Sequence, residues 1–481
     1  SPLAAIPHKS RAYRQILDLA RGARTSNTQH PSVNDTTNKQ LAPQHSMKEL
    51  GSVLPRLIYA AATADEEAGP LLWAKWDIAD GYWRMAVAED DEWNFAYVLP
   101  KEHESEPTRI VRPMSLQMGW SESPPFFCAA TETARDNAAA RMQAPAAQLD
   151  KHPLEDLTID QGHLATLQHN FPTLQTEEHF HDFTKLVEVY IDDFIAMAQT
   201  TDEAELRHIS SAIMHSIHEV FPPPTITGQE PTQDPISLKK LLKGDGVWQT
   251  WKEILGWIFD GVRRCIEYPE DKVLSLTAEL KTVGRATRIP YKRLEKLRGH
   301  MRHAAIGIPG GRGLVSPLDR ALNTTARWID VRNNDELRDA LTDFRALLKI
   351  IATKPTHFKQ LVADTPAFVG FNDASGRGAG GVWIPWVTEQ HLEPVVWRVE
   401  WPPDITGDLV SFNNPHGRLT NSDLEMAAQL LEFLALECLV DLRHVHAASW
   451  CDNTPTISWT NKLNSSKSRV AACLIRALAL R

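Results

Sequence analysis

Cysteine is scarce in this sequence, and long apolar runs are absent. The five cysteines are odd in number, widely spaced and never paired as CxxC, which argues against a disulfide framework and against a structural zinc site. No run approaches about 18 uncharged apolar residues, and the first residues lack the layout of a signal peptide. We therefore expect an intracellular protein of the cytoplasm or nucleus, neither secreted nor bound to a membrane.

The length is that of a protein with more than one domain. The chain has 481 residues, of which 42% are hydrophobic and 23% charged, a composition typical of globular proteins and not of disordered ones. It begins without methionine and stops inside an apolar helical pattern. We expect a fragment of a longer polyprotein.

Positive charge is in deficit overall, with a net charge of −10, which by itself argues against a nucleic-acid partner. The deficit arises in one acidic stretch, residues 150–206, whereas residues 1–24 and 281–330 are basic. These two basic regions could bind phosphates. A solvated charged face is the alternative.

Three segments interrupt the pattern of helices and strands. Residues 136–182 are polar and weakly periodic, which indicates an inserted helical or loop segment, hereafter the insert. Residues 221–236 contain five prolines and indicate a linker or surface loop. Residues 352–366 separate a helical pattern from a new strand, and we expect a domain boundary there. Strands and helices do not alternate regularly in the first 260 residues, which favours an α+β fold.

Two adjacent acids, Asp192 and Asp193, lie between two apolar half-strands in KLVEVYIDDFIAMA. This layout predicts a hairpin whose tight turn carries both carboxylates. A third acid, Asp77, ends another apolar strand. Three carboxylates meeting at strand ends suit Mg²⁺, with Mn²⁺ as a substitute, and two such ions can hold the attacking and leaving oxygens of a phosphoryl transfer. For an isolated Asp-Asp pair, a solvated turn is the alternative.

In their order along the chain, these residues resemble the reverse transcriptase family. Residues 190–193, Tyr-Ile-Asp-Asp, are similar to its YxDD box, and residues 77–82 to its first carboxylate motif. Between them, residues 114–132 resemble the family's L-P-x-G-x-x-x-[SA]-P-x-x-F segment, although Gln117-Met118 replaces the family's Pro-x. The stretch between that segment and the YxDD box is longer than in the family because it contains the insert.

The resemblance implies roles for five residues. Asp77 and Asp192 would bind both metal ions, with Asp193 the weaker ligand. Tyr82 would be a steric gate that rejects a 2′-hydroxyl and so selects dNTPs; a core tyrosine is the alternative. Gly119 would allow the backbone to approach the template base; a plain turn glycine is the alternative.

The resemblance extends to both basic regions. Residues 6–19 are similar to a fingers hairpin in which Lys9 or Arg11, together with Arg14, contacts the incoming triphosphate. Residues 296–323 are similar to the thumb helices of retrotransposon enzymes. The residues expected to grip the RNA template and DNA primer are Lys292, Arg293, Arg298 and Arg302.

A second acidic set follows near the C-terminal end. Asp373 lies on an apolar strand, Glu425 in the first turn of an amphipathic helix, and Asp452 at the end of a further strand. This order resembles the ribonuclease H fold, and the sequence motifs around the three acids are similar to those of DIRS-type retroelements. It implies a second Mg²⁺ site, which cleaves RNA in an RNA–DNA hybrid. The family's last metal ligand has no evident counterpart before Arg481, so we expect either a truncated domain or impaired hydrolysis.

We therefore predict an α+β right-hand polymerase followed by an α/β ribonuclease H-like domain. Fingers and palm would extend to about residue 270, the thumb over about 271–330, a connecting segment over 331–365 and the ribonuclease H-like domain over 366–481. The predicted function is RNA-directed DNA synthesis in a retroelement. The second acidic set argues against a cellular or intron-type reverse transcriptase. The remaining alternative is a decayed or domesticated copy that binds nucleic acid without catalysis.

Overall fold

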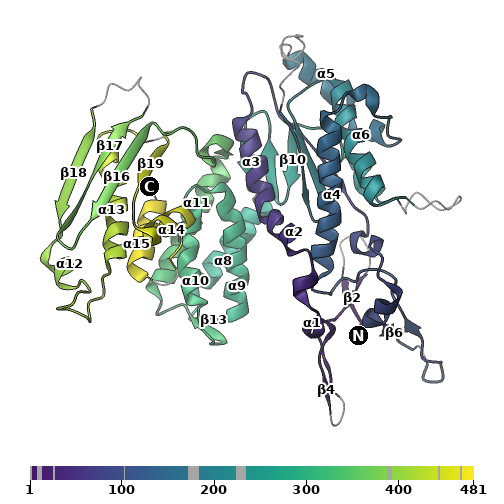
Figure 1. Ribbon diagram of the computed structural model, residues 1–481, viewed down its shortest axis with the longest axis horizontal. Coiled ribbons are helices and arrows are strands. Elements are labelled where there is room, and N and C mark those ends of the chain that lie inside the picture. The colour runs from purple at the N-terminus through teal and green to yellow at the C-terminus, as the bar shows by residue number, and fades with distance from the viewer. Residues whose placement is uncertain are drawn as a thin grey trace. The chain divides into compact units, whose positions relative to one another are not determined.

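The computed structural model describes residues 3–7, 13–24, 28–101, 103–171, 184–223, 234–386, 393–442, 445–465 and 468–480. Contacts divide the chain into two compact units, Ser1–Ile254 and Leu255–Arg481 (Figure 1). Each unit combines helices with sheets, which confirms the mixed composition expected from the sequence. No helix in the described part of the chain is both long and apolar enough to cross a membrane.

The first unit holds the elements before residue 255. Its strands are β1 (Leu3–Pro7), β2 (Tyr13–Leu17), β3 (Ala23–Arg24), β4 (Gln29–His30), β5 (Leu72–Asp77), β6 (Tyr97–Val98), β7 (Ile110–Val111), β8 (Lys185–Tyr190), β9 (Asp193–Ala198) and β10 (Trp251–Ile254). Its α-helices are α1 (Val33–Thr36), α2 (Gln44–Glu49), α3 (Val53–Thr63), α4 (Ser123–Gln143), α5 (Gln161–Asn170), α6 (Glu203–Val220) and α7 (Leu238–Leu241). Its 3₁₀ helices are η1 (Lys39–Leu41), η2 (Leu50–Ser52), η3 (Gly81–Arg84), η4 (Glu89–Phe95), η5 (Ala146–Gln148) and η6 (Glu155–Thr158).

A three-stranded antiparallel sheet in the order β5-β9-β8 forms the centre of the first unit. Both β5 and β9 are apolar along nearly their whole length and are buried, as expected of a sheet that is covered by other elements. Helices α4 and α6 pack against each other and share one apolar core with the three strands (Figure 1). This core holds the strand ends that carry the acids.

The described part of the insert is helical and packs onto this core. Helix α4 continues to Gln143, and α5 follows after two short 3₁₀ helices. Leu164 and Leu167 of α5 are buried in the core, and Leu154 and Leu157 pack against it. The insert is therefore a structural part of the first unit, and helix is the correct reading for much of it.

The second unit begins with a helical portion and continues into a sheet. Its strands are β11 (Trp257–Asp260), β12 (Cys265–Glu267), β13 (Arg288–Pro290), β14 (Trp328–Asp330), β15 (Thr356–His357), β16 (Phe368–Ala374), β17 (Gly378–Pro385), β18 (Val395–Glu400) and β19 (Ala447–Trp450). Its α-helices are α8 (Glu270–Arg285), α9 (Tyr291–Ala304), α10 (Ser316–Ala321), α11 (Asp335–Thr353), α12 (Pro403–Gly407), α13 (Asn421–Glu437), α14 (Thr454–Lys462) and α15 (Arg469–Ala479). Its 3₁₀ helices are η10 (Ala305–Gly307), η11 (Gly311–Val315) and η12 (Phe358–Gln360).

The larger sheet of the second unit has the order β18-β17-β16-β19, with β19 parallel to β16 and the other pairs antiparallel. Helix α13 packs on β16 and β17, and α15 packs on α13 (Figure 1). Helix α15 also contacts η11, where Gly310 and Gly313 lie against Ala479. The expected thumb and ribonuclease H portions thus share one compact unit, and the boundaries near residues 330 and 366 stay a prediction.

Candidate active site

Three carboxylates meet where the strands of the central sheet end. Asp77 is the last residue of β5 and is paired with Asp193, the first residue of β9. Tyr190 and Asp193 are paired across the β8–β9 hairpin, which leaves Ile191 and Asp192 as its two-residue turn. Oxygen atoms of Asp77, Asp192 and Asp193 lie within 4.8 Å of one another. The structure brings together the first acidic set expected from the sequence.

The turn between β8 and β9 is strained. Ile191 has φ of 59°, the left-handed region that a β-branched side chain rarely adopts. Such a conformation costs of order 1–3 kcal/mol and is concentrated at functional sites. The strained turn places Asp192 beside the end of β5, where its carbonyl oxygen accepts a 2.9 Å hydrogen bond from the Ile78 amide.

The electrostatics of the trio favour a bound cation. The pKa of Asp77 is raised to about 7, chiefly by burial and also by the charges of Asp192 and Asp193, while Lys240 acts in the opposite direction. Two carboxylates forced close to a third repel unless a positive charge lies among them. Oxygen-only ligands of this kind are those preferred by Mg²⁺ and Mn²⁺. The donor set therefore fits the expected metal.

Lys240, on the short helix α7, supplies a positive charge at this site. Its Nζ forms an ion pair with Asp77 Oδ1 and lies 3.7 Å from Asp193 Oδ1. Burial opposes the charge on Lys240, but the carboxylates leave its pKa above the usual value. Sequence reasoning missed this residue because Lys240 and Asp77 are 163 residues apart and nothing in the local pattern around Lys240 marks it.

Tyr82 lies on η3, immediately after the end of β5, and is half-buried. Its ring makes an edge-on contact with the buried Phe127 of α4, with ring centroids 5.3 Å apart. A Cβ added at Gly81 would approach Phe127 Cζ to 2.4 Å, so the backbone needs glycine there to bring η3 onto α4. Packing against Phe127 thus holds the Tyr82 ring on the apolar core of the first unit, and its role as a gate stays a prediction.

Gly119 adopts φ of 114°, and a Cβ at this position would lie 2.1 Å from the carbonyl oxygen of Leu17. Glycine is therefore required by the backbone itself. The close neighbour in the structure is the end of β2, whereas the resemblance implies a template base. The Gly119 carbonyl also accepts a 3.0 Å hydrogen bond from Asn34 Nδ2. Contact with a template base stays a prediction.

The expected triphosphate contacts fall mostly outside the described residues. Lys9 and Arg11 belong to the residues that the structure does not describe, and so does the side chain of Arg14. The backbone of Arg14 pairs with Ile6 in the β1–β2 hairpin. A hairpin is therefore present where the resemblance implies one, and the contacts with triphosphate stay a prediction.

The second acidic set lies around the N-terminal end of α13. Glu425 is buried, and ligand atoms of Glu425, Cys451 and Asp452 lie within 4.8 Å of one another. Burial raises the pKa of Glu425 to about 7, and the charges of Asp373 and Asp452 add to the rise. One carboxylate oxygen of Glu425 is buried without a hydrogen-bond partner. Glu425 and Asp452 thus lie close together with Cys451, and Asp373 acts on Glu425 through its charge. Carboxylates arranged in this way suit a divalent cation.

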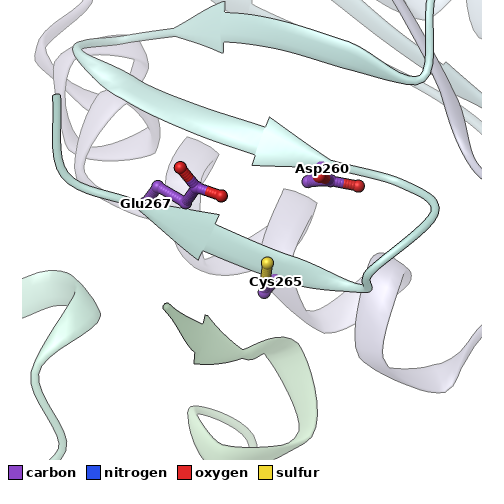
Figure 2. A group of neighbouring side chains, drawn as sticks. All are labelled: Asp260, Cys265 and Glu267. Atoms are coloured by element: carbon purple, nitrogen blue, oxygen red, sulfur yellow. The ribbon is translucent and has the colours of Figure 1, made fainter. Parts of the chain in front are cut away.

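A third cluster, Asp260, Cys265 and Glu267, has a structural explanation. The three side chains extend from the β11–β12 hairpin (Figure 2). Asp260 accepts hydrogen bonds from the Val262 and Arg263 amides at 3.0 and 2.8 Å, and from Arg263 Nε at 2.7 Å. Arg263 also pairs with Glu267. The acids therefore hold a tight turn through one arginine, and we assign no site to them.

Four basic residues of α9 are expected to bind nucleic acid, and Asp319 of α10 forms ion pairs with two of them. Arg302 Nη2 lies 2.9 Å from both carboxylate oxygens of Asp319, and Arg298 lies 3.5 Å from one of them. Lys292 and Arg293 are exposed, and the ion pairs of the described residues include neither. Sequence spacing cannot reveal these ion pairs because Asp319 belongs to another helix. Lys292 and Arg293 therefore retain more free charge.

We expect the residues paired with Asp319 to contribute less than Lys292 and Arg293 to the salt dependence of nucleic-acid binding. Replacing Lys292 and Arg293 with Gln should lower the steepness of log K against log salt for duplex binding by about two, since each phosphate contact contributes about 0.9. The matched double variant Arg298→Gln/Arg302→Gln should change the slope by about half as much, because the single charge of Asp319 already offsets one of these two arginines. Filter binding or fluorescence anisotropy at several salt concentrations measures both slopes. Equal slopes for wild type and both variants would place α9 away from nucleic acid.

Comparisons with known proteins give limited information. No protein-family model matches the sequence, and no curated protein matches it. Among solved structures, the foamy viral protease-reverse transcriptase dRH in complex with double-stranded DNA is similar, with 13% identity and a TM-score of 0.44 over 99% of this chain and 63% of that one. The foamy viral protease-reverse transcriptase in complex with RNA/DNA hybrid has 14% identity and a TM-score of 0.42 over 99% and 48%. The chain thus spans less than two thirds of the length of either structure, and these values are too low to assign it to a family.

Proposed function

We propose that this chain is an RNA-directed DNA polymerase that extends a DNA primer from dNTPs, with a second site that cleaves RNA in RNA–DNA hybrids. The observation that carries the proposal is the convergence of Asp77, Asp192 and Asp193 at a strained hairpin whose sequence is Tyr-Ile-Asp-Asp. Two divalent ions held there would stabilise charge on the primer 3′ oxygen and on the triphosphate as one phosphodiester bond forms and pyrophosphate leaves.

The residues of the chain would position the reactants around that charge. Asp77 and Asp192 would hold the ions, and Asp193 would contribute more weakly. The ion pair with Lys240 favours the ionised form of Asp77 and opposes the rise in its pKa that burial causes. The exposed charges of Lys292 and Arg293 would bind the primer–template backbone without reading its sequence.

Removal and return of metal tests this proposal. We expect the chain to extend a DNA primer on an RNA template in Mg²⁺, to stop when EDTA is added, and to resume when Mg²⁺ or Mn²⁺ is restored. Ca²⁺ serves as the matched control, because it binds carboxylates but accepts a looser and larger coordination shell. Extension that continues in excess EDTA would exclude a metal-dependent polymerase.

Sugar selection follows from the place of Tyr82. Replacing Tyr82 with Val removes the ring proposed as the gate and should raise incorporation of ribonucleotides relative to deoxynucleotides by about a hundredfold, since a clash with one hydroxyl is relieved. The control is Tyr82→Phe, which keeps the ring and its contact with Phe127 and should select as wild type does. Single-nucleotide incorporation with dNTP and rNTP in parallel measures the ratio. If Tyr82→Val leaves it unchanged, Tyr82 is a core residue.

A further inference from the structure

The insert is tied to the first carboxylate site by a chain of two histidines and an aspartate. His152, in the insert, contacts His218 of α6, with 3.2 Å between Nε2 and Nδ1. His218 Nε2 in turn lies 3.0 Å from Asp234 Oδ1. His152 is almost wholly buried, and His218 and Asp234 are about four fifths buried. The chain therefore runs through a largely dry part of the first unit.

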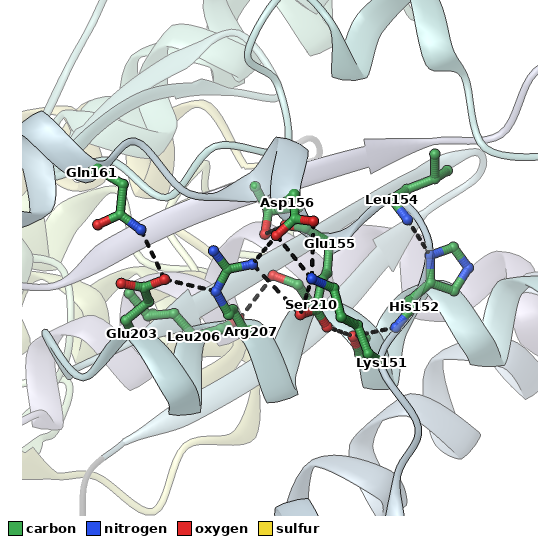
Figure 3. Close-up of polar contacts among 12 residues, drawn as sticks. Lys151, His152, Leu154, Glu155, Asp156, Gln161, Glu203, Leu206, Arg207 and Ser210 are labelled. Carbon is green, nitrogen blue, oxygen red and sulfur yellow. Dashed lines mark hydrogen bonds and ion pairs between the residues drawn. The ribbon is translucent and has the colours of Figure 1, made fainter.

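The direction of every hydrogen bond in this chain is set by its first member. His152 Nδ1 accepts from the Leu154 amide at 3.1 Å (Figure 3), so the proton of the neutral ring is on Nε2 and is donated to His218 Nδ1. His218 then carries its own proton on Nε2 and donates it to Asp234. Burial lowers the pKa of His152 to about 4, helped by His218 and His215, so this ring stays neutral at neutral pH.

Further contacts hold the insert on α6 around this chain. The His152 amide donates to Ser211 Oγ at 3.1 Å. Arg207 of α6 binds Asp156 of the insert at 2.6 Å and Glu203 of its own helix at 2.8 Å (Figure 3). His152 therefore has little freedom to leave His218.

Asp234, the last residue of this hydrogen-bond chain, anchors the segment that borders the carboxylate site. Its Oδ1 accepts a 2.7 Å hydrogen bond from the Ile236 amide, and its carbonyl accepts one from Arg84 at 2.8 Å. The next residues pair with the end of β5: the Ala79 amide donates to the Pro235 carbonyl, and the Ser237 amide donates to the Asp77 carbonyl, both at 2.8 Å.

We propose that His152, His218 and Asp234 are positioning residues for the polymerase reaction. The chain holds residues 235–237 against residues 77–79 and so fixes the backbone of Asp77, as well as the start of α7, which carries Lys240. A metal-binding carboxylate must be held to within a fraction of an ångström, and a displacement of about 1 Å can cost a hundredfold in rate. The inference rests on the proposed function and assigns to the insert the task of bracing the site.

Two variants of His218 separate positioning from mere packing. His218→Leu keeps the approximate volume but can neither accept from His152 nor donate to Asp234. In His218→Gln, the side-chain oxygen can accept and the nitrogen can donate in the same directions. The matched control is His215→Gln on the same helix, because His215 contacts the Asp150 carbonyl and the His152 ring but makes none of the hydrogen bonds that lead to Asp234.

Amide hydrogen exchange tests the hydrogen bonds from His152 to Asp234 and does not require enzymatic activity. In the full chain, we expect His218→Leu to speed exchange of the Ala79 and Ser237 amides about tenfold, because their acceptors become mobile. His218→Gln and His215→Gln should exchange as wild type does. Unchanged exchange in His218→Leu, or equal acceleration in His218→Gln, would overturn the proposal. If His218→Leu fails to fold, Asp234→Asn is used instead. We expect it to speed exchange of the same amides about threefold, because a neutral acceptor makes a weaker hydrogen bond. Unchanged exchange in Asp234→Asn would also overturn the proposal.

Primer extension gives the second readout. We expect kcat to fall about tenfold in His218→Leu with little change in the KM for dNTP, and to return in His218→Gln. An unchanged kcat, or a rise in KM alone, would contradict a role in positioning Asp77. If wild type fails to extend primers while the exchange results hold, the proposed function fails and the bracing of β5 by the insert stands.

Discussion

Asp192→Asn should lower the rate of primer extension by about a thousandfold or more, equivalent to about 4 kcal/mol of transition-state stabilisation. The substitution keeps the size of the side chain but removes a charge from the group formed with Asp77 and Asp193. A metal ion held by fewer charges binds more weakly and is less well placed for phosphoryl transfer. Single-turnover extension in Mg²⁺ measures the loss.

The matched control for this variant is Asp80→Asn. Asp80 follows the end of β5 but has φ of 56°, a left-handed conformation that asparagine also accepts, so this variant should fold and extend primers at a rate near wild type. Thermal unfolding of both variants checks that they are folded. Primer extension by Asp192→Asn at a near wild-type rate would show that the YIDD turn takes no part in the reaction.

Asp373→Asn should abolish cleavage of RNA in an RNA–DNA hybrid and leave primer extension intact. Asp373 lies on β16, and its charge is felt by Glu425 of α13, whose pKa is already raised by burial. Loss of one carboxylate from this set should reduce cleavage by at least about a hundredfold, because a divalent ion depends on the charges that surround it. Gel analysis of a labelled hybrid measures cleavage.

The reciprocal variant serves as the control. Asp192→Asn should still cleave the hybrid, and Asp373→Asn should still extend a primer, since the first set lies at the ends of β5 and β9 and the second lies on β16, on α13 and after β19. If Asp373→Asn cleaves as well as wild type, the second set keeps only the architecture of a nuclease.

Local pattern is enough to predict the hairpin that carries Asp192 and Asp193. Two apolar half-strands flank a pair of acids, and a two-residue turn with one left-handed residue closes them. The same reasoning places Asp77 at a strand end, but its register against Asp193 is a tertiary contact between strands far apart in the chain. The resemblance to a family implies that these acids bind the same metal ions but not which of their residues are paired.

The contacts that tune both sites could not be predicted from the sequence. Lys240 reaches Asp77 across 163 residues, and Asp319 neutralises Arg302 from another helix. Both contacts depend on how the helices pack, and helix packing cannot be inferred from the pattern of charges along the sequence. The insert is the clearest case, because its polar composition predicts only a helical or loop segment, and nothing in it indicates that His152 is buried and linked to α6.

Templated incorporation of single nucleotides tests the central proposal most directly. A DNA primer is annealed to four RNA templates that differ only in the next base, and each is offered one dNTP at a time with Mg²⁺ and the wild-type chain. We expect the primer to lengthen by one nucleotide only where the dNTP complements the template, and not in Asp192→Asn. Failure of wild type to extend any of the four primers, or extension that ignores the template base, would contradict RNA-directed DNA synthesis at this site.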